Sequence, residues 1–301
     1  MVSGKGGTGK TSVVAALAVQ AGRLVIADCD VDASNLHLVL EPTVRQRHEF
    51  SGGKRARIVP ELCSACGACE EVCRFDAVER RASGPRGDEL AYIIRPLSCQ
   101  GCGVCAWACP TGAIAFEPMV NGEWYLSDSR VGPMLHAHLE AGAENSGKLV
   151  TVIRQRARGL AGEEMVDLLL VDGPPGVGCP VIAALSGADA ALIVAEPTAA
   201  GYHDFERIAD LAAHFEIPAA LCINKCDLDA EVARRLEATA AERQIPCLAH
   251  IRYDRAFGRA QRQRQTVVEL EPQTGAAADL RELWQNLQPL VANSEHTLPV
   301  L

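Results

Sequence analysis

The segment that most constrains the fold lies at the start of the chain, where residues 4–11 read Gly-Lys-Gly-Gly-Thr-Gly-Lys-Thr. They fill every position of the phosphate-binding pattern G-x-x-x-x-G-K-[ST]. Closely spaced glycines let the backbone turn sharply and direct successive N–H groups inward, where phosphate oxygens can accept from them. We expect the Lys10 ammonium to reach the β- and γ-phosphates of a nucleotide and the Thr11 hydroxyl to bind Mg²⁺. The residues predicted to surround the phosphates are Gly6, Gly7, Thr8, Gly9, Lys10 and Thr11.

A second lysine in this loop, Lys5, is not required by the general pattern. With the residues that follow it gives K-G-G-x-G-K-T, which resembles the deviant Walker A motif of the MinD, ParA and nitrogenase iron protein group. The resemblance implies a homodimer, or a heterodimer with a paralogue, that forms around ATP, with Lys5 of one subunit contacting phosphates bound by the other. Such a cation would neutralise charge that develops in the transition state. Lys5 and Lys10 are therefore catalytic candidates, the alternative for Lys5 being a simple surface cation.

The composition narrows the classes of protein to which the chain can belong. Its 301 residues suffice for one large α/β domain and a small one. A formal net charge of -9 argues against a nucleic-acid partner, because such partners are held by positive surfaces. No apolar run is long enough to span a membrane, and the phosphate-binding loop occupies the place of a signal peptide, so we expect a cytoplasmic protein. In that reducing compartment the 13 cysteines are expected to be metal ligands or reactive thiols rather than disulfides.

Apolar segments follow the loop in the manner of an α/β fold. Residues 24–27 form a continuous apolar run that ends at Asp28, and residues 168–171 form another that ends at Asp172. Parallel strands buried on both faces read as such runs, and ligands bind at their carboxyl ends. Only residues 1–3 precede the loop, so either the first strand is very short or the natural start lies upstream. We predict a doubly wound, mostly parallel P-loop NTPase sheet.

The aspartates at these strand ends match positions of the same family group. Asp28-x-Asp30, followed by Asn35, resembles its switch I, which implies that Asp28 supports Mg²⁺ and that Asp30 orients or activates the attacking water. A polar strand end without a role is the alternative. Asp172 matches the Walker B aspartate that holds Mg²⁺ through water. The Gly-Pro-Pro-Gly that follows resembles switch II, in which the Gly176 N–H senses the γ-phosphate and the prolines transmit the nucleotide state.

Two cysteine runs occupy the middle of the chain. The first has the spacing C-x-x-C-x-x-C-x-x-x-C, and the second repeats it 36 residues later and ends in C-P. Gly67 recurs as Gly103, so the segment is an internal duplication. In bacterial two-cluster ferredoxins, three cysteines of one run and the fourth of the other bind each [4Fe–4S] cluster. We therefore assign one cluster to Cys63, Cys66, Cys69 and Cys109, and the other to Cys99, Cys102, Cys105 and Cys73.

The cysteine runs also mark an inserted domain. Two complete runs favour iron over zinc, which is the alternative metal for Cys-x-x-Cys pairs. The composition changes at about residue 57 and returns to α/β character after Glu117. We predict a small α+β two-cluster ferredoxin domain, residues 57–117, inserted in a discontinuous P-loop ATPase domain made of residues 1–56 and 118–301.

A further nucleotide-related motif lies at residues 224–227, where Asn-Lys-Cys-Asp has the pattern N-K-x-D. In GTPases this motif recognises guanine through its aspartate, whereas in the MinD group a similar asparagine contacts the base of ATP. Because Lys5 places the chain with the MinD group, we expect Asn224 to contact adenine. Cys179 lies at the offset from Asp172 of a cluster-binding cysteine in the nitrogenase iron protein. No second ligand accompanies it, so we interpret it as an unliganded thiol.

Two segments carry purely structural predictions. The apolar run at residues 149–152 predicts a strand after a turn. Near the C-terminus, apolar residues recur at helical spacing at positions 280, 283, 284, 287 and 290. This helix contains Pro289 and few basic residues, which favours packing on its own domain over the membrane anchoring used by MinD.

As a whole the chain resembles MinD-superfamily P-loop ATPases that carry an inserted ferredoxin domain, over nearly all of its length. Three functions remain open. The first is ATP-gated electron transfer through two [4Fe–4S] clusters, the second an Fe–S assembly or carrier ATPase of the Mrp kind, and the third a positioning ATPase of the MinD type with a redox-sensing ferredoxin. Complete ferredoxin spacing favours stable clusters over transferable ones, so we rank electron transfer first. These motifs identify neither the redox partner nor an Fe–S acceptor.

Overall fold

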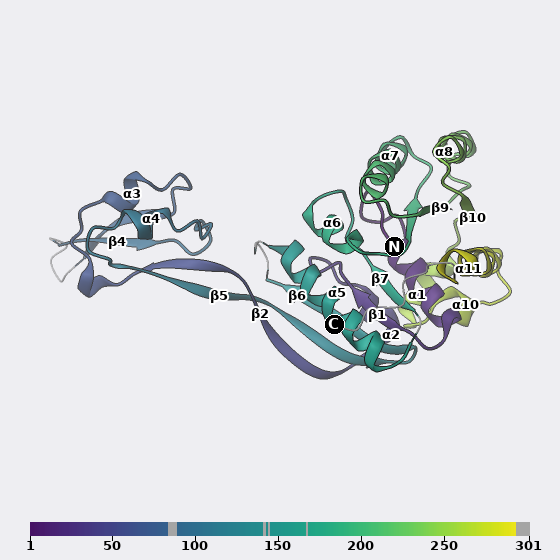
Figure 1. The fold of residues 1–301 in the computed structure, drawn as a ribbon, viewed down its shortest axis with the longest axis horizontal. Helices are drawn as coiled ribbons and strands as arrows, with labels where there is room; N and C mark the ends of the chain where they lie inside the picture. The colour runs from purple at the N-terminus through teal and green to yellow at the C-terminus, as the bar shows by residue number, and fades with distance from the viewer. Residues whose placement is uncertain (84–88, 141–142, 144, 167, 293–301) are drawn as a thin grey trace. The chain divides into compact units, whose positions relative to one another are not determined.

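The computed structural model describes residues 1–83, 89–140, 143, 145–166 and 168–292 (Figure 1). The chain forms two compact units, which we describe separately. The first unit comprises Met1–His48, Glu123–Leu139 and Ser146–Leu301, and the second comprises Glu49–Gly122 and Glu140–Asn145.

Parallel strands form the centre of the first unit. Strand β1 (Val25–Asp28) pairs in parallel with β6 (Gly132–Leu139) and with β7 (Leu169–Asp172). Strand β9 (Ala219–Asn224) pairs in parallel with β8 (Ala191–Ala195) and β10 (Cys247–Ile251). All five residues of β8 and all four of β1 are buried, which is why both read as unbroken apolar runs in the sequence.

Residues 1–3 join these two sets of strands. The Val2 N–H donates to the Leu192 carbonyl at 3.0 Å, and the Val2 carbonyl accepts from Val194 at 2.9 Å. On the other side, the Met1 carbonyl accepts from the Gly173 N–H at 2.9 Å. The three residues before the phosphate-binding loop therefore take the place of a central strand between β7 and β8.

Helices pack on both faces of these strands. One buried apolar cluster joins α1 (Lys10–Ala21) and α11 (Gly275–Ala292) to the sheet, and a second joins α6 (Cys179–Leu185), α7 (Ala199–His214) and α8 (Ala230–Glu242) to it. The remaining helices of this unit are α2 (Leu36–Leu40), α5 (Ser146–Glu163), α9 (Ala256–Arg262) and α10 (Val267–Leu270). The predicted α/β, mostly parallel doubly wound class is confirmed. No helix within the described residues combines the length and hydropathy that crossing a bilayer requires.

Two structural predictions have opposite outcomes. The predicted strand at residues 149–152 is wrong, because these residues lie in α5. Its buried positions are Leu149, Val150, Ile153, Ala157 and Ala161, a helical spacing that extends beyond the short apolar run. The predicted C-terminal helix is present as α11, and Leu280, Leu283 and Leu287 bury its apolar face in its own unit.

The second unit contains the cysteine runs. Strands β3 (Val78–Ser83) and β4 (Glu89–Ile94) pair antiparallel, and each cysteine run carries a short helix, α3 (Ala68–Glu71) or α4 (Val104–Ala108), with the 3₁₀ turn η1 (Pro60–Leu62) before the first run. The long strands β2 (Thr43–Ile58) and β5 (Ile114–Ser129) are neighbours in a sheet of order β2-β5-β6-β1-β7 and belong partly to each unit. The boundaries predicted from composition, at residues 57 and 117, lie inside these two strands.

Candidate functional site

The phosphate-binding loop has one open and one closed side. Gly7 and Gly9 have φ values of 82° and 88°, in the left-handed region that favours glycine. A Cβ atom added to Gly6 or Gly7 would meet nothing within 4 Å, whereas one on Gly9 would lie 2.3 Å from the Asn224 Nδ2 atom. The backbone around Gly6 and Gly7 thus leaves the space that phosphate oxygens need, and the Gly9 side is filled by protein.

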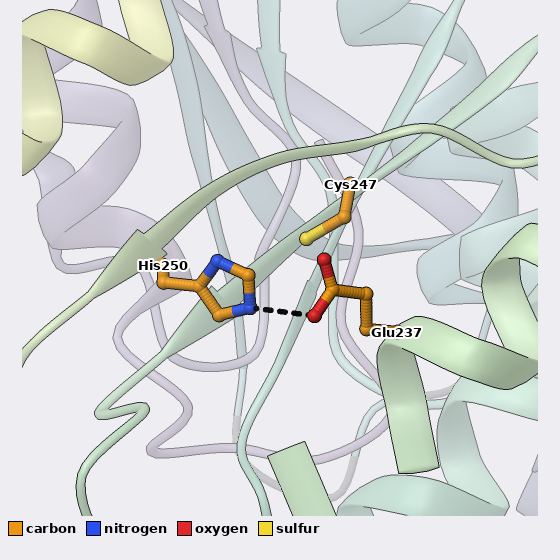
Figure 2. Close-up of side chains that lie close together, drawn as sticks. All are labelled: Glu237, Cys247 and His250. Atoms are coloured by element: carbon orange, nitrogen blue, oxygen red, sulfur yellow. Dashed lines mark ion pairs between the residues drawn. The ribbon is translucent and has the colours of Figure 1, made fainter. Parts of the chain in front are cut away.

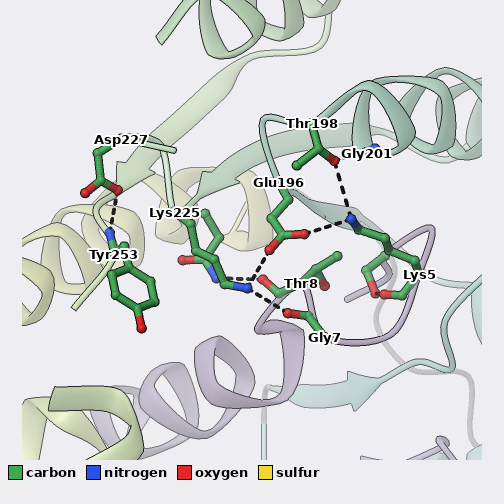
Figure 3. Close-up of polar contacts among 11 residues, drawn as sticks. Lys5, Gly7, Thr8, Glu196, Thr198, Gly201, Lys225, Asp227 and Tyr253 are labelled. Atoms are coloured by element: carbon green, nitrogen blue, oxygen red, sulfur yellow. Dashed lines mark hydrogen bonds and ion pairs between the residues drawn. The ribbon is translucent and has the colours of Figure 1, made fainter. Parts of the chain in front are cut away.

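Two residues of the N-K-x-D motif hold the loop. The Asn224 Nδ2 atom donates to the Thr8 carbonyl at 2.6 Å, and the Lys225 ammonium donates to the Gly7 carbonyl at 2.9 Å (Figure 3). Asn224 is only 5% exposed, and its Oδ1 atom has no hydrogen-bond partner among the described residues. Asp227 is exposed and accepts from the Tyr253 N–H at 2.7 Å. In the structure the Asn224 amide group therefore positions the loop.

Beneath the loop, Lys10 forms an ion pair with Asp172. Asp172 lies opposite Asp28 in the pairing of β7 with β1, and both carboxylates are fully buried. Asp172 Oδ2 has no hydrogen-bond partner among the described residues. An unpaired oxygen on one of two adjacent buried carboxylates fits a divalent cation, because hard cations such as Mg²⁺ take oxygen ligands. Thr11 is the second residue of α1, directly after Lys10.

The two carboxylates repel one another. Burial, and next the charge of Asp172, raise the pKa of Asp28 to about 7. The Ser34 hydroxyl donates to Asp28 at 2.6 Å and the Asp30 N–H at 3.2 Å, which partly offsets this effect. Burial also raises the pKa of Asp30, which is near enough to Lys10 and Asp172 for both charges to act on it. Three predicted site residues, Asp28, Asp30 and Asp172, are therefore brought together.

Lys5 is held by a residue that the sequence did not identify. Its ammonium lies 2.9 Å from Glu196 Oε2 and 3.4 Å from the Thr198 hydroxyl (Figure 3). Glu196 also pairs with Lys225 at 2.5 Å, so one carboxylate holds two lysines. Burial acts to raise the pKa of Glu196, but hydrogen bonds from Lys225 and Lys5 outweigh it and leave this pKa below its ordinary value. The sequence did contain one signal for Glu196, namely its position. It directly follows the buried strand β8, just as Asp172 ends β7.

The switch II glycine has a partner inside the protein. Gly176 has a φ of 97°, and its N–H donates to the Ser3 carbonyl at 2.9 Å. Ser3 lies between strands β7 and β8, directly before the phosphate-binding loop. Any contact of the Gly176 N–H with a γ-phosphate requires this bond to open.

In the second unit, four cysteines surround one pocket. Its lining includes one cysteine from the second run and three from the first. These are Cys63, Cys66, Cys69 and Cys109, the set that crossed ligation predicts. Among the described residues, the cysteines of the two runs do not form a group of three whose sulfur atoms all lie within 4.8 Å of one another.

The two runs have matching local geometry. Gly67 and Gly103 precede α3 and α4 with φ values of 81° and 78°. The Ala77 N–H donates to Cys73 Sγ at 3.4 Å, and at the equivalent position the Ala113 N–H donates to Cys109 Sγ at 3.3 Å. Burial, and to a smaller extent the neighbouring Cys99 and Cys102, raise the pKa of Cys105. The internal duplication in the sequence is therefore also present in the structure.

The five remaining cysteines lie in the first unit. All thirteen are free thiols in the structure. Cys179 is exposed at the start of α6, and Cys222 is fully buried in β9. Burial raises the pKa of Cys222 well above its ordinary value, as expected for a thiol that serves as a small apolar side chain.

Comparisons with known proteins agree with this geometry. The family model for the CobQ/CobB/MinD/ParA nucleotide binding domain matches residues 1–267. The chain belongs to this family. An uncharacterized protein of Methanocaldococcus jannaschii is 34% identical over 229 residues, which are 75% of this chain and 76% of that protein. The predicted resemblance to MinD-type P-loop proteins is confirmed.

Two further matches are to a MinD structure and to a ferredoxin. The solved structure of the Pyrococcus furiosus cell division ATPase MinD has a TM-score of 0.56 at 19% identity, covering 96% of this chain and 97% of that one, and so shares the fold. A 7Fe ferredoxin of Hydrogenibacillus schlegelii is 33% identical over 79 residues, 25% of this chain and 92% of that protein. The MinD/ParA-type chain therefore carries a segment similar to ferredoxins.

Proposed function

We propose that this protein hydrolyses ATP and couples the nucleotide state of a dimer to electron transfer through two [4Fe–4S] clusters. The observation that carries the proposal is that one chain holds both a P-loop above two buried carboxylates and four cysteines around one pocket. Neither the P-loop nor the group of cysteines would by itself indicate a coupled function. Their presence in one chain of the MinD/ParA family favours a nucleotide-dependent redox protein.

The nucleotide half would work through rearranged charges. Lys10 leaves Asp172 and donates to the β- and γ-phosphates, and Asp172 and Asp28 then become available to hold Mg²⁺ together with Thr11. Bound Mg²⁺ supplies neutralisation of phosphate charge. Asp30 positions the attacking water, since its carboxylate lies beside the same group of charges. Lys5 leaves Glu196 and reaches the phosphates held by a partner subunit, where it stabilises the transition state.

The ferredoxin half would hold its clusters by the crossed sets of cysteines. The first cluster would be bound by Cys63, Cys66, Cys69 and Cys109. The second cluster would be bound by Cys73 together with the three close cysteines of the second run. Such clusters supply one-electron transfer at low potential. The N–H groups that point at Cys73 and Cys109 stabilise negative charge on these sulfurs, an environment that tunes cluster potentials.

Hydrogen bonds, joined by one step along the chain, connect switch I to the segment that carries the clusters. This connection supports the proposed coupling between nucleotide state and clusters. Val31, beside the switch I aspartates, accepts at its carbonyl from the Leu139 N–H at 3.2 Å. The next residue along the chain, Glu140, donates from its N–H to the Asn121 carbonyl at 3.0 Å, and the Asn121 side chain accepts from the Gly52 N–H at 2.8 Å. A nucleotide that moves switch I would therefore pull on the ends of the segment that carries the clusters.

Turnover and iron content test the proposal. Lys10→Ala should lower ATP turnover by about 100-fold or more, as loss of one transition-state donor typically does. Lys148→Ala, at the exposed start of α5, is the matched control and should keep full turnover. Anaerobically prepared protein should contain about eight irons and eight sulfides per chain. Turnover by the Lys10→Ala protein equal to that of the control, or zinc in place of iron, would overturn the proposal.

A further inference from the structure

A glutamate, a cysteine and a histidine meet beside the edge strand β10 (Figure 2). Glu237 comes from α8, and Cys247 and His250 come from β10. One ligand atom from each lies within 4.8 Å of the other two. None of these three residues belongs to a nucleotide or cluster motif.

A bulge in β10 creates this grouping. Residues three apart on a regular strand point to opposite faces, so Cys247 and His250 would be separated. The pairing with β9 shifts between Cys247 and Ala249, which leaves Leu248 as an extra residue. Leu248 and Ala249 both pack into the apolar cluster that contains α1 and α11, whereas Cys247 packs against the cluster that contains α8. The bulge therefore turns both donors of β10 toward α8, a use of bulges that is common at functional sites.

The third donor is fixed in place by the packing of its helix. Ala233, Leu236 and Ala240 bury the inner face of α8 against the strands. Glu237 follows Leu236 directly and reaches His250, whose Nε2 atom lies 3.5 Å from Glu237 Oε2. The burial of α8 therefore sets the position of the Glu237 backbone beside β10, from which its carboxylate is within reach of Cys247 and His250.

The geometry points to a transition-metal ion, and we propose that Glu237, Cys247 and His250 form a zinc site. Oxygen and nitrogen donors on a tetrahedral zinc lie about 3.3 Å apart, close to the 3.5 Å between Glu237 and His250. A thiolate and an imidazole suit Zn²⁺ and not Mg²⁺ or Ca²⁺, which take oxygen ligands. The side chains of His250 and Glu237 are 41% and 51% exposed, so the fourth ligand position is open to water or to a donor from a partner.

Zinc uptake by the full-length protein tests the site. Anaerobic protein with its iron retained is equilibrated with chelator-buffered Zn²⁺, and zinc and iron per chain are measured together. We expect one zinc per chain in the wild type and its loss in Cys247→Ser and in His250→Gln. The matched controls Cys179→Ser and His203→Gln change an exposed cysteine and an exposed histidine outside the group, and should keep the zinc.

X-ray absorption at the zinc edge separates this site from zinc bound by the ferredoxin cysteines. The proposed site gives one sulfur at about 2.3 Å with nitrogen and oxygen at about 2.0–2.1 Å, whereas the cysteine runs would give a shell of sulfurs. A wild-type protein that takes up no more zinc than Cys247→Ser, or a zinc shell made of four sulfurs, would overturn the inference. A wild-type protein that takes up no extra zinc leaves the proposed function untouched, whereas four-sulfur zinc bound in place of iron would also contradict the proposed function.

Discussion

At the scale of single residues, carboxylates of the protein compete with the phosphates of a nucleotide for the two lysines of the phosphate-binding loop. Lys10 is paired with Asp172, and Lys5 is paired with Glu196, although both lysines are expected to serve phosphates. In the proposed mechanism both pairs separate when the nucleotide binds. The sequence predicted Lys5, Lys10 and Asp172 from motif positions, but Glu196 belongs to no motif and emerged only from the geometry.

The pH dependence of stability tests the buried carboxylate pair. The pKa of Asp28 is raised from 3.8 to about 7, so the folded protein resists losing this proton while the unfolded chain loses it readily. The favourable contribution of protonated Asp28 is full below about pH 4 and is lost as the pH rises through about 7. Burial lowers the pKa of His136 to about 4, which makes stability rise with pH and opposes the effect of Asp28. We therefore compare wild type with Asp28→Asn, and expect the thermal midpoint of nucleotide-free wild type, relative to that of the variant, to fall between pH 5 and pH 8. A difference between the two proteins that does not change with pH would contradict the role of Asp28.

Removing the charge of Glu196 should release Lys5. The Lys5 side chain is 35% exposed, and pairs of this kind contribute at most about 1 kcal/mol, so the effect should be small. We expect Glu196→Gln to dimerise with ATP at a protein concentration about two- to fivefold lower, measured by analytical ultracentrifugation. The control is Asp227→Asn, because this carboxylate lies at the same edge of the sheet as Glu196 and does not contact Lys5. The effect should vanish in a Lys5→Ala background; its persistence there would mean that Glu196 acts through Lys225 instead.

At the scale of elements, the clearest agreement between sequence and structure is the duplicated cysteine segment. The ferredoxin pattern predicted the set Cys63, Cys66, Cys69 and Cys109, and these four line one pocket; the other set stays a prediction. The long strands β2 and β5 were not predicted, since the many charged residues of β2, and Pro118, Asn121 and Gly122 in β5, interrupt the alternation that usually marks a strand. The bulge in β10 was also beyond prediction, because a change of face within a strand depends on the partner strand.

Paired substitutions test crossed ligation. Changing two ligands of one cluster should destroy that cluster alone, whereas changing one ligand of each should damage both. We therefore expect Cys66→Ser with Cys109→Ser to retain about four irons per chain, and Cys66→Ser with Cys73→Ser to lose most of the iron. Iron analysis and visible absorption measure the difference. Uncrossed ligation would reverse the two results.

At the scale of the whole molecule, the sequence predicted two kinds of site in one chain, and the family and ferredoxin matches support both. It could not predict a route for the proposed coupling between them, because such a route depends on hydrogen bonds between distant segments. Val31 and Leu139 are more than a hundred residues apart, and their bond brings the switch I region next to the chain that re-enters the second unit. If nucleotide binding shifts that bond, the environment of the clusters changes with it.

The reduction potential of the clusters, measured without nucleotide, with Mg-ADP and with a non-hydrolysable ATP analogue, tests this coupling most directly. Coupling of about 1–3 kcal/mol is typical of such switches, and corresponds to a shift of about 40–130 mV for one electron. We expect a shift of that size on binding the ATP analogue, and a smaller one in Lys5→Ala with unchanged iron content. The same potential in all three states would contradict nucleotide-coupled electron transfer.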